Sequence, residues 1–157
     1  MIFSLENKVV IITGGSSGIG RAISILFAQQ GAEIHIFDLQ SQLSEDTISE
    51  VQQLNKNSKF HPVDITNEQL VLDDINALSV IDILINNAGI AQIGNVENTS
   101  SGDFQKIFEV NVKGAFNCIK AVIPTMVKNK SGVILNMASV ASSVGIPDRF
   151  GYSMTKG

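Results

Sequence analysis

The chain has 157 residues, of which 44% are hydrophobic and 17% are charged, and these values predict one globular domain with a hydrophobic core. Its net charge is -4 and its lysines are scattered, so the sequence offers no basic surface for nucleic acid or for an anionic membrane. Its apolar runs are far shorter than the roughly 20 residues of a membrane span, so we expect a small-molecule partner and no membrane partner.

Cysteine usage and the first residues bear on the compartment. Cys118 is the only cysteine, which excludes an intramolecular disulfide and a cysteine-built metal site, and we expect it to be a buried filler. The opening residues, MIFSLENKVV, contain no basic segment followed by an apolar stretch and a cleavage site, so we expect a cytoplasmic location. His35 and His61 lack metal-ligand spacing, and structural roles are expected for both, with no metal site.

Short β-rich runs alternate with segments of helical period, which is the pattern of βαβ units around a parallel sheet. Pro62 in the third run indicates a strand at the sheet edge, because proline cannot donate a ladder hydrogen bond. The nearly continuous apolar character of the fourth run indicates burial on both faces. The expected strands are residues 8–13, 33–38, 59–63, 81–86 and 132–137.

Helix signals occupy the segments between the strands. Gly31 is expected to end the first helix as a C′ glycine. Capping-box spacing, a hydroxyl residue followed three positions later by a side chain that can bond back, occurs at Thr66 with Gln69 and again at Ser100 with Asp103. Apolar stripes mark the helices over residues 18–30, 43–54, 66–77 and 112–126.

Right-handed crossovers between these strands predict the sheet order 3-2-1-4-5, which is a Rossmann-type, doubly wound α/β fold. The winding reverses between strands one and four, so a ligand is expected at the carboxyl ends of these two strands. No linker, repeat or low-complexity tract divides the chain, and residues 1–157 are expected to form a single nucleotide-binding domain.

The segment TGGSSGIG, residues 13–20, lies between the first strand and the first helix. Glycine permits positive φ and close approach of backbone N–H groups to a pyrophosphate, and the helix N-terminus favours an anion. Such loops also serve as plain turns, but here an acidic residue, Asp38, ends the next strand, which predicts a dinucleotide site. Asp38 is expected to accept hydrogen bonds from the adenosine ribose and to repel a 2′-phosphate, which favours NAD over NADP.

Five segments in this order make the chain resemble the short-chain dehydrogenase/reductase family. They are the loop TGGSSGIG, the acid of PVDIT, the sequence NNAG at residues 86–89, the pair Asn111 and Ser139, and the pair Tyr152 and Lys156. The resemblance covers the whole chain and implies a nicotinamide-dependent oxidoreductase that interconverts a secondary alcohol and a ketone. The cofactor-binding residues that it implies are Gly14, Ser16, Ser17, Gly18, Ile19, Gly20, Asp38, Asp64, Ile65, Asn87, Ala88, Gly89, Tyr152 and Lys156.

Hydride transfer between nicotinamide and an alcohol carbon needs a group that exchanges the hydroxyl proton near neutral pH. Tyr152 is the only tyrosine, and because a free phenol has a pKa of about 10, its phenolate must be stabilised for this role. Lys156 follows four residues later, which on a helix places its charge on the same face and favours the phenolate. The resemblance further implies that Lys156 binds the nicotinamide ribose, that Ser139 holds the substrate oxygen, and that Asn111 anchors a water chain to the lysine.

Structural roles and other functions remain open for these residues. A tyrosine and a lysine at this spacing commonly form a solvated helix face, Ser139 could cap a helix, and Asn87 with Gly89 could form only a turn. The chain could be a non-catalytic nucleotide-binding fragment, or a methyltransferase that holds its nucleoside cofactor on the glycine-rich loop. The paired tyrosine and lysine argue against methyl transfer, which needs no such acid and base.

Members of the resembled family continue beyond the lysine with the rest of the active-site helix, two more strands and a substrate-covering loop. We therefore interpret the sequence as an incomplete domain of an active parent, truncated at the C-terminus, and whether it is active alone stays open. The geometry of Tyr152 and Lys156 is expected to be poorly held in it, and strand five is expected to be an open edge.

Substrate and assembly are only implied by the resemblance. The stretch GIPDRFGYSMTKG is similar to members that act on sugar-derived acids, including 2-keto-3-deoxy-fuconate dehydrogenases. Fatty-acyl ketones, steroids and cyclic alcohols stay open as substrates. The family implies that the parent is a homo-oligomer, either a dimer or a tetramer.

Overall fold

A computed structural model describes residues 3–157, and a sheet of five parallel strands lies at its centre. The sheet order is β3-β2-β1-β4-β5, which confirms the doubly wound arrangement expected from the sequence. The first two residues of the opening stretch, considered above for a targeting signal, lie outside the described residues. The strands are β1 (Val9–Thr13), β2 (Glu33–Asp38), β3 (Lys59–Pro62), β4 (Ile83–Asn86) and β5 (Val133–Asn136).

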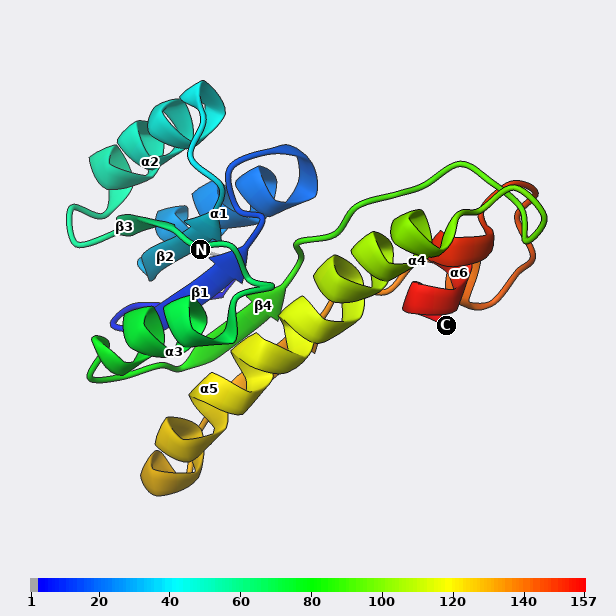
Figure 1. Cartoon of the computed structure of the whole chain (residues 1–157). Coiled ribbons are helices and arrows are strands. Elements are labelled where there is room, and N and C mark those ends of the chain that lie inside the picture. Colours follow the sequence, from blue (N-terminus) through cyan, green and yellow to red (C-terminus); the bar gives the residue numbers. More distant parts are fainter. Residues whose placement is uncertain (1–2) are drawn as a thin grey trace.

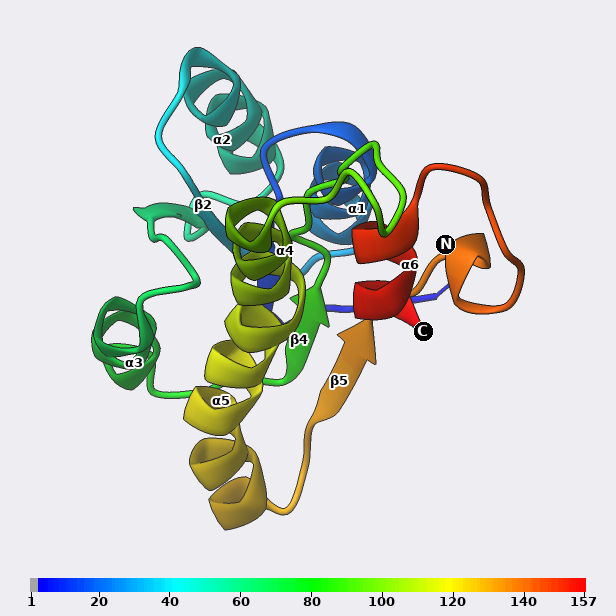
Figure 2. The same ribbon diagram turned by 45° about the vertical axis from the view of Figure 1, so that its right-hand side comes forward.

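Helices cover both faces of this sheet (Figure 1). One face carries α1 (Gly18–Gln29) and α2 (Gln42–Leu54), and the other carries α3 (Glu68–Asn76) and α5 (Ala115–Asn129). Two further helices, α4 (Ser101–Phe108) and α6 (Phe150–Lys156), lie side by side beyond the carboxyl ends of the strands (Figure 2). Within residues 3–157, none of the helices combines the length and the apolar character needed to cross a membrane.

Alternation along the strands builds one hydrophobic core on each face. In β1, Val10 and Ile12 pack towards α1 and α2, whereas Ile11 packs towards α3 and α5. β4 lies between β1 and β5, and its Leu84 and Ile85 are fully buried on opposite faces. The predicted burial of this strand on both faces is therefore confirmed, although the strand begins at Ile83 rather than at residue 81.

The edge strand β3 and the end of helix α1 follow the sequence signals at Pro62 and Gly31. β3 is an edge strand with Pro62 as its last residue, one position earlier than expected. Gly31 has a φ of 95°, and its N–H donates to Ala28 O at 3.0 Å. The N–H of Ala32 donates to Phe27 O at 3.1 Å, which completes a Schellman motif after α1.

The start of α3 corrects one expectation. Asn67, not Thr66, is the N-cap, and its side chain accepts hydrogen bonds from the backbone N–H groups of Gln69 and Leu70. The hydroxyl of Thr66 instead donates to Asp64 Oδ1 at 2.8 Å, because that carboxylate lies two residues before it and also takes the Thr66 N–H. At α4 the expected cap is present, since Ser100 Oγ accepts from the Asp103 N–H at 3.1 Å.

The two histidines belong to a chain of polar contacts that joins β2, β3 and α3. His35 is 1% exposed, and its Nδ1 lies 2.9 Å from His61 Nε2. The other nitrogen of His35 lies 2.9 Å from Glu33 Oε1, and His61 Nδ1 lies 2.6 Å from Asp74 Oδ1. Burial lowers the pKa of His35, while the hydrogen bond to Glu33 opposes this shift. Both histidines therefore tie strands and a helix together, as expected of structural residues.

Candidate active site

The glycine-rich loop packs directly against the turn that follows β4. Gly14 has a φ of 62°, and a Cβ at this position would lie 2.9 Å from Ala88 Cα. A Cβ at Gly20 would overlap the carbonyl oxygen of Gly14. These two positions require glycine because the loop folds tightly onto itself and onto its neighbour.

Side chains at the ends of β1 and β4 fix this contact. Thr13 Oγ1 accepts hydrogen bonds from the N–H groups of Asn87 and Ala88, at 3.1 and 3.0 Å. The side-chain amide of Asn87 donates to Thr13 O and to Gly14 O, at 3.1 and 3.0 Å. Asn87 therefore holds the glycine-rich loop through its side chain, in addition to its place in the turn after β4.

Asp38 lies at the carboxyl end of β2, beside the same loop. Its Oδ2 accepts from the Ser16 N–H at 3.1 Å, and its Oδ1 accepts from the Leu39 N–H at 2.8 Å. A carboxylate has about four lone-pair positions, so acceptor capacity remains for ribose hydroxyls. Thr47 on α2 donates to Ser16 O at 2.9 Å and fixes the loop from its other side.

A cleft of about 860 Å³ opens along the carboxyl ends of β1, β2 and β4. Asp64 lines it, with one carboxylate oxygen engaged by Thr66, and Asn117 on α5 donates to Ile65 O at 2.9 Å. Ser16 lies in the loop and Gly20 lies in the first turn of α1, and neither lines the cleft. Ten of the expected cofactor-binding residues line it, namely Gly14, Ser17, Gly18, Ile19, Asp38, Asp64, Ile65, Asn87, Ala88 and Gly89.

A π-helical segment, Glu109–Gly114, joins α4 to α5 and contains Asn111. The side chain of Asn111 is 8% exposed. Its Oδ1 accepts from the Ile90 N–H at 2.8 Å, and its Nδ2 donates to Ile90 O at 2.9 Å and to Thr155 Oγ1 at 3.0 Å. π segments of this kind occur frequently at functional sites.

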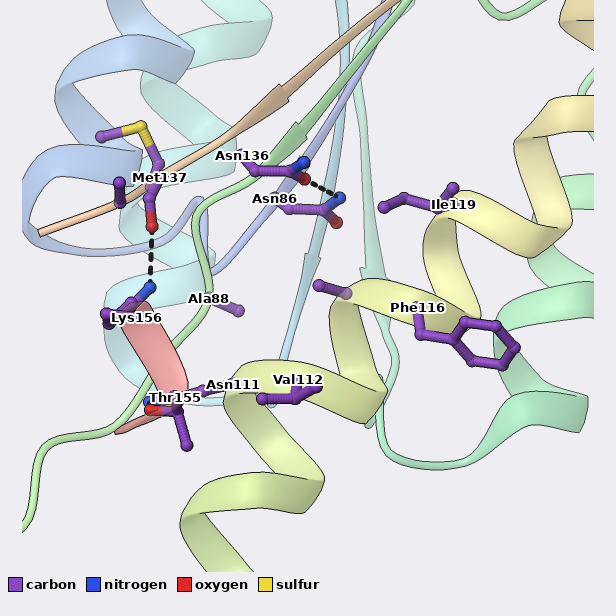
Figure 3. A pocket seen from close by; sticks show the side chains of 12 residues that line it. Asn86, Ala88, Asn111, Val112, Phe116, Ile119, Asn136, Met137, Thr155 and Lys156 are labelled. Atoms are coloured by element: carbon purple, nitrogen blue, oxygen red, sulfur yellow. Dashed lines mark hydrogen bonds between the residues drawn. The ribbon is translucent and has the colours of Figure 1, made fainter. Parts of the chain in front are cut away.

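Tyr152 and Lys156 lie one turn apart on α6. The Nζ atom of Lys156 donates to Met137 O at 2.8 Å, just beyond β5 (Figure 3). A Cβ at Gly89 would lie 3.3 Å from Asn111 Oδ1 and 3.5 Å from Lys156 Nζ, so both groups gather beside the turn after β4. Tyr152 does not line the 860 Å³ cleft.

Ser139 follows β5 and caps a 3₁₀ turn, Val140–Ser142, by accepting from the Ala141 N–H at 3.2 Å. The cap uses a lone pair of the hydroxyl and leaves its proton free to be donated. The capping role considered from the sequence is therefore present. Donation to a substrate oxygen is compatible with it.

A second cavity, of about 350 Å³, lies between β4, β5 and the start of α5 (Figure 3). Asn86 Nδ2 donates to Asn136 Oδ1 at 2.9 Å along its wall, and the buried Oδ1 of Asn86 has no partner within residues 3–157. Lys156 and Thr155 lie at one end of this cavity. Ala88, in the turn after β4, lines both this cavity and the larger cleft.

Two residues of this region were missed by the sequence reasoning. Thr13 joins the ends of β1 and β4, and its position as the last residue before the glycines was the available signal. Thr155 bonds both to the Asn111 side chain and to the Tyr152 carbonyl within α6, and its position directly before Lys156 was the available signal. The reach of the Asn111 amide could not be read from spacing, because 44 residues separate it from Thr155.

The remaining chemistry-bearing side chains lie outside this site. Within the described residues 3–157, there is no cluster of three or more histidine, cysteine, aspartate or glutamate residues arranged to hold a metal ion. Cys118 is fully buried in the core between the sheet and α5. Burial raises the pKa of its thiol to about 12, which keeps it protonated and unreactive.

Comparison with known proteins gives a consistent result. A family model described as short chain dehydrogenase matches residues 8–157. The chain is 39% identical over 155 residues to an uncharacterized oxidoreductase of Thermotoga maritima, covering 98% of this chain and 62% of that protein. It is 35% identical over 157 residues to a cyclopentanol dehydrogenase of Comamonas sp., with coverages of 98% and 63%.

Solved structures agree with these sequence matches. The fold superimposes on NAD+-bound xylitol dehydrogenase with a TM-score of 0.94 at 30% sequence identity. This match covers 99% of the present chain and 62% of the xylitol dehydrogenase chain. The chain thus spans somewhat less than two thirds of the length of the proteins it matches.

Proposed function

The chain belongs to the short-chain dehydrogenase family, and on that premise we propose that it binds NAD and serves hydride transfer between a secondary alcohol and a ketone. The observation that carries this proposal is a convergence at one end of the sheet. The glycine-rich loop after β1, the Asn111 amide and the Lys156 ammonium all lie around the turn that follows β4. The carboxyl ends of strands at a winding reversal are where ligands bind in such folds.

The residues of the cleft fit a dinucleotide. A Cβ added at Gly18, where φ is 51°, would meet nothing within 4 Å, so the loop backbone faces open space at the N-terminus of α1. The buried Oγ of Ser16 has no partner within residues 3–157. Backbone N–H groups at this helix end would hold the pyrophosphate, and Asp38 would hold the adenosine ribose.

Selectivity for NAD is proposed from the surroundings of Asp38. The adjacent Leu39 is 63% exposed and apolar, so it offers no positive charge to a 2′-phosphate. A second negative group beside the Asp38 carboxylate would be repelled. The NAD+ bound to the xylitol dehydrogenase neighbour is in line with this choice.

We propose that Tyr152 exchanges the proton of the substrate hydroxyl through its phenolic oxygen. Lys156, four residues later on α6, favours the phenolate through its charge. Ser139 can donate its free hydroxyl proton to the substrate oxygen while its lone pair caps the 3₁₀ turn. Bound nicotinamide supplies or accepts the hydride at the alcohol carbon.

A second candidate is nucleotide binding without turnover. It is favoured by the fact that the large cleft is lined by the expected nucleotide residues but not by Tyr152 or Ser139. In this case the chain holds the cofactor, whereas substrate is not brought to the tyrosine. The two candidates differ in turnover and agree in cofactor affinity.

Calorimetric titration with NADH and NADPH, followed by an assay of nicotinamide absorbance with a panel of small secondary alcohols and ketones, tests both candidates. The proposal expects tighter binding of NADH than of NADPH, and turnover of at least one alcohol. Binding without turnover selects the second candidate. Absence of binding to either nucleotide contradicts both.

We further propose that the protein acts on small molecules in the cytoplasm as a homo-oligomer. Apolar side chains stand exposed along α4 and α5, among them Phe108, Phe116 and Val127. Exposed apolar surface of this kind commonly marks a contact between subunits. Light scattering of the purified protein measures its mass in solution, and a mass of two or more chains is the expected result.

A further inference from the structure

The hydroxyl of Thr155 holds a central place on α6. Its Oγ1 accepts from Asn111 Nδ2 at 3.0 Å and donates to Tyr152 O at 2.9 Å. A threonine side chain is stiff at χ1, and donation to the carbonyl three residues earlier is one of its two favoured states in a helix. The hydroxyl of Thr155, the residue before Lys156, therefore joins Asn111 to the backbone carbonyl of Tyr152.

Asn111 is itself rigidly held at the other end of this link. Both N–H bonds of its amide are used, one on Ile90 O and one on Thr155 Oγ1, and its Oδ1 accepts from the Ile90 N–H. An amide has two N–H donors, so both donors of Asn111 are satisfied by these two partners. The π segment, the turn after β4 and α6 thus meet at one buried side chain.

Contacts with other elements hold α6 at both of its described ends. Its first residue is held by the Phe150 N–H, which donates to Gly94 O at 3.0 Å, and by stacking of Phe150 on Phe104. Its last turn is held by Thr155 and by the bond from Lys156 to Met137 O. Lys156 is the residue whose position is in question, so the bond between Thr155 and Asn111 is the contact that holds this turn independently of the lysine.

We propose that Thr155 is a positioning residue that fixes Tyr152 and Lys156 relative to each other and to the turn after β4. This inference rests on the proposed function for its catalytic meaning. Loss of the hydroxyl leaves the Asn111 N–H buried without a partner and releases the turn that carries Lys156. The charge of the lysine then stabilises the phenolate of Tyr152 less well.

The composition of the chain provides a direct readout. Tyr152 is the only tyrosine and there is no tryptophan, so the phenolate absorbance measured against pH reports this one side chain. Thr155→Val removes the hydroxyl and keeps the shape. Thr155→Ser keeps the hydroxyl and removes a methyl group, which makes it the matched control.

We expect T155V to move the midpoint of the phenolate absorbance upward by about one pH unit, as expected when an opposite charge is displaced. We expect T155S to keep the wild-type midpoint. With a substrate in hand, T155V lowers kcat about tenfold or more, and T155S restores kcat. A wild-type midpoint in T155V overturns the inference.

Circular dichroism establishes whether each variant is folded. If T155V does not fold, Thr155→Ala replaces it, since alanine brings no extra methyl group against the Asn111 amide, and it is judged by the same midpoint. Failure of the proposed function is read elsewhere, in the absence of NADH binding by the wild-type chain. The difference between the valine and serine variants needs no cofactor and is decided independently.

Discussion

At the scale of single residues, the choice between the two nicotinamide nucleotides depends on what stands beside Asp38. Leu39 is exposed and lines the cleft, so a replacement there disturbs no core. We predict that Leu39→Arg improves the Kd for NADPH about tenfold, roughly 1.4 kcal/mol, because an arginine can pair with the 2′-phosphate. The Kd for NADH should change little in the same calorimetric titration.

Leu43 provides the matched control for this prediction. It is 58% exposed on α2 and does not line the cleft, so Leu43→Arg makes the same change of net charge elsewhere. An equal gain of NADPH affinity in both variants would mean that the effect is general attraction and not a contact beside Asp38.

Tyr152 is the residue on which turnover is proposed to depend. Tyr152→Phe removes one hydroxyl and keeps the ring, and we predict that kcat falls about 100-fold or more, the usual contribution of a general acid and base. The Kd for NADH should stay at its wild-type value, since the nucleotide cleft does not include this side chain. Met154→Leu, on an exposed position of the same helix, is the control that should keep its activity.

At the scale of elements, the contacts between β2, β3 and α3 make stability depend on pH. Burial lowers the pKa of His35, and the neighbouring His61 and Lys59 act in the same direction, while Glu33 opposes them. The unfolded chain therefore binds more protons than the folded chain between the folded-state pKa and the ordinary value near 6.5. The free energy of unfolding is fully retained above about pH 6.5 and falls as the pH is lowered through this window.

Urea denaturation at several pH values measures this slope. We predict that His35→Asn flattens it, because one titrating group is removed, by at most about 1.4 kcal/mol per pH unit. Any slope that remains in the variant belongs to groups other than His35. A slope equal to that of the wild-type chain would show that His35 is not the group responsible.

Strands and their order could be predicted from the sequence because their periodicity and glycine signals are local. Pro62 and Gly31 act through backbone geometry alone, and both behave as expected. The start of α3 was predicted wrongly because the Thr66 hydroxyl bonds to the Asp64 carboxylate and does not cap the helix, and Asn67 is the N-cap instead. The π segment around Asn111 has no sequence period of its own, and the bonds of the Asn111 side chain to Ile90 and to Thr155 on α6 join residues far apart in the sequence.

At the scale of the whole molecule, the two cores are coupled through the strands that they share. Leu84 in β4, which lies between β1 and β5, is fully buried. We predict that Leu84→Ala lowers the free energy of unfolding by about 2–5 kcal/mol, the range for a cavity left by a large aliphatic residue. Leu26→Ala, at a position 45% exposed on α1, should cost far less in the same urea titration. Similar losses in both variants would contradict this account of the core.

The winding order of the sheet also has a consequence for synthesis on the ribosome. The first three strands, β1 to β3, are contiguous in the sheet and carry α1 and α2 on one face. These five elements therefore leave the ribosome, and can pack against one another, before β4 emerges from it. Chains are made from the N-terminus at about 5–20 residues per second. The glycine-rich loop and Asp38 can thus meet as a nascent half-sheet, and Asn87 arrives later to close it against Thr13.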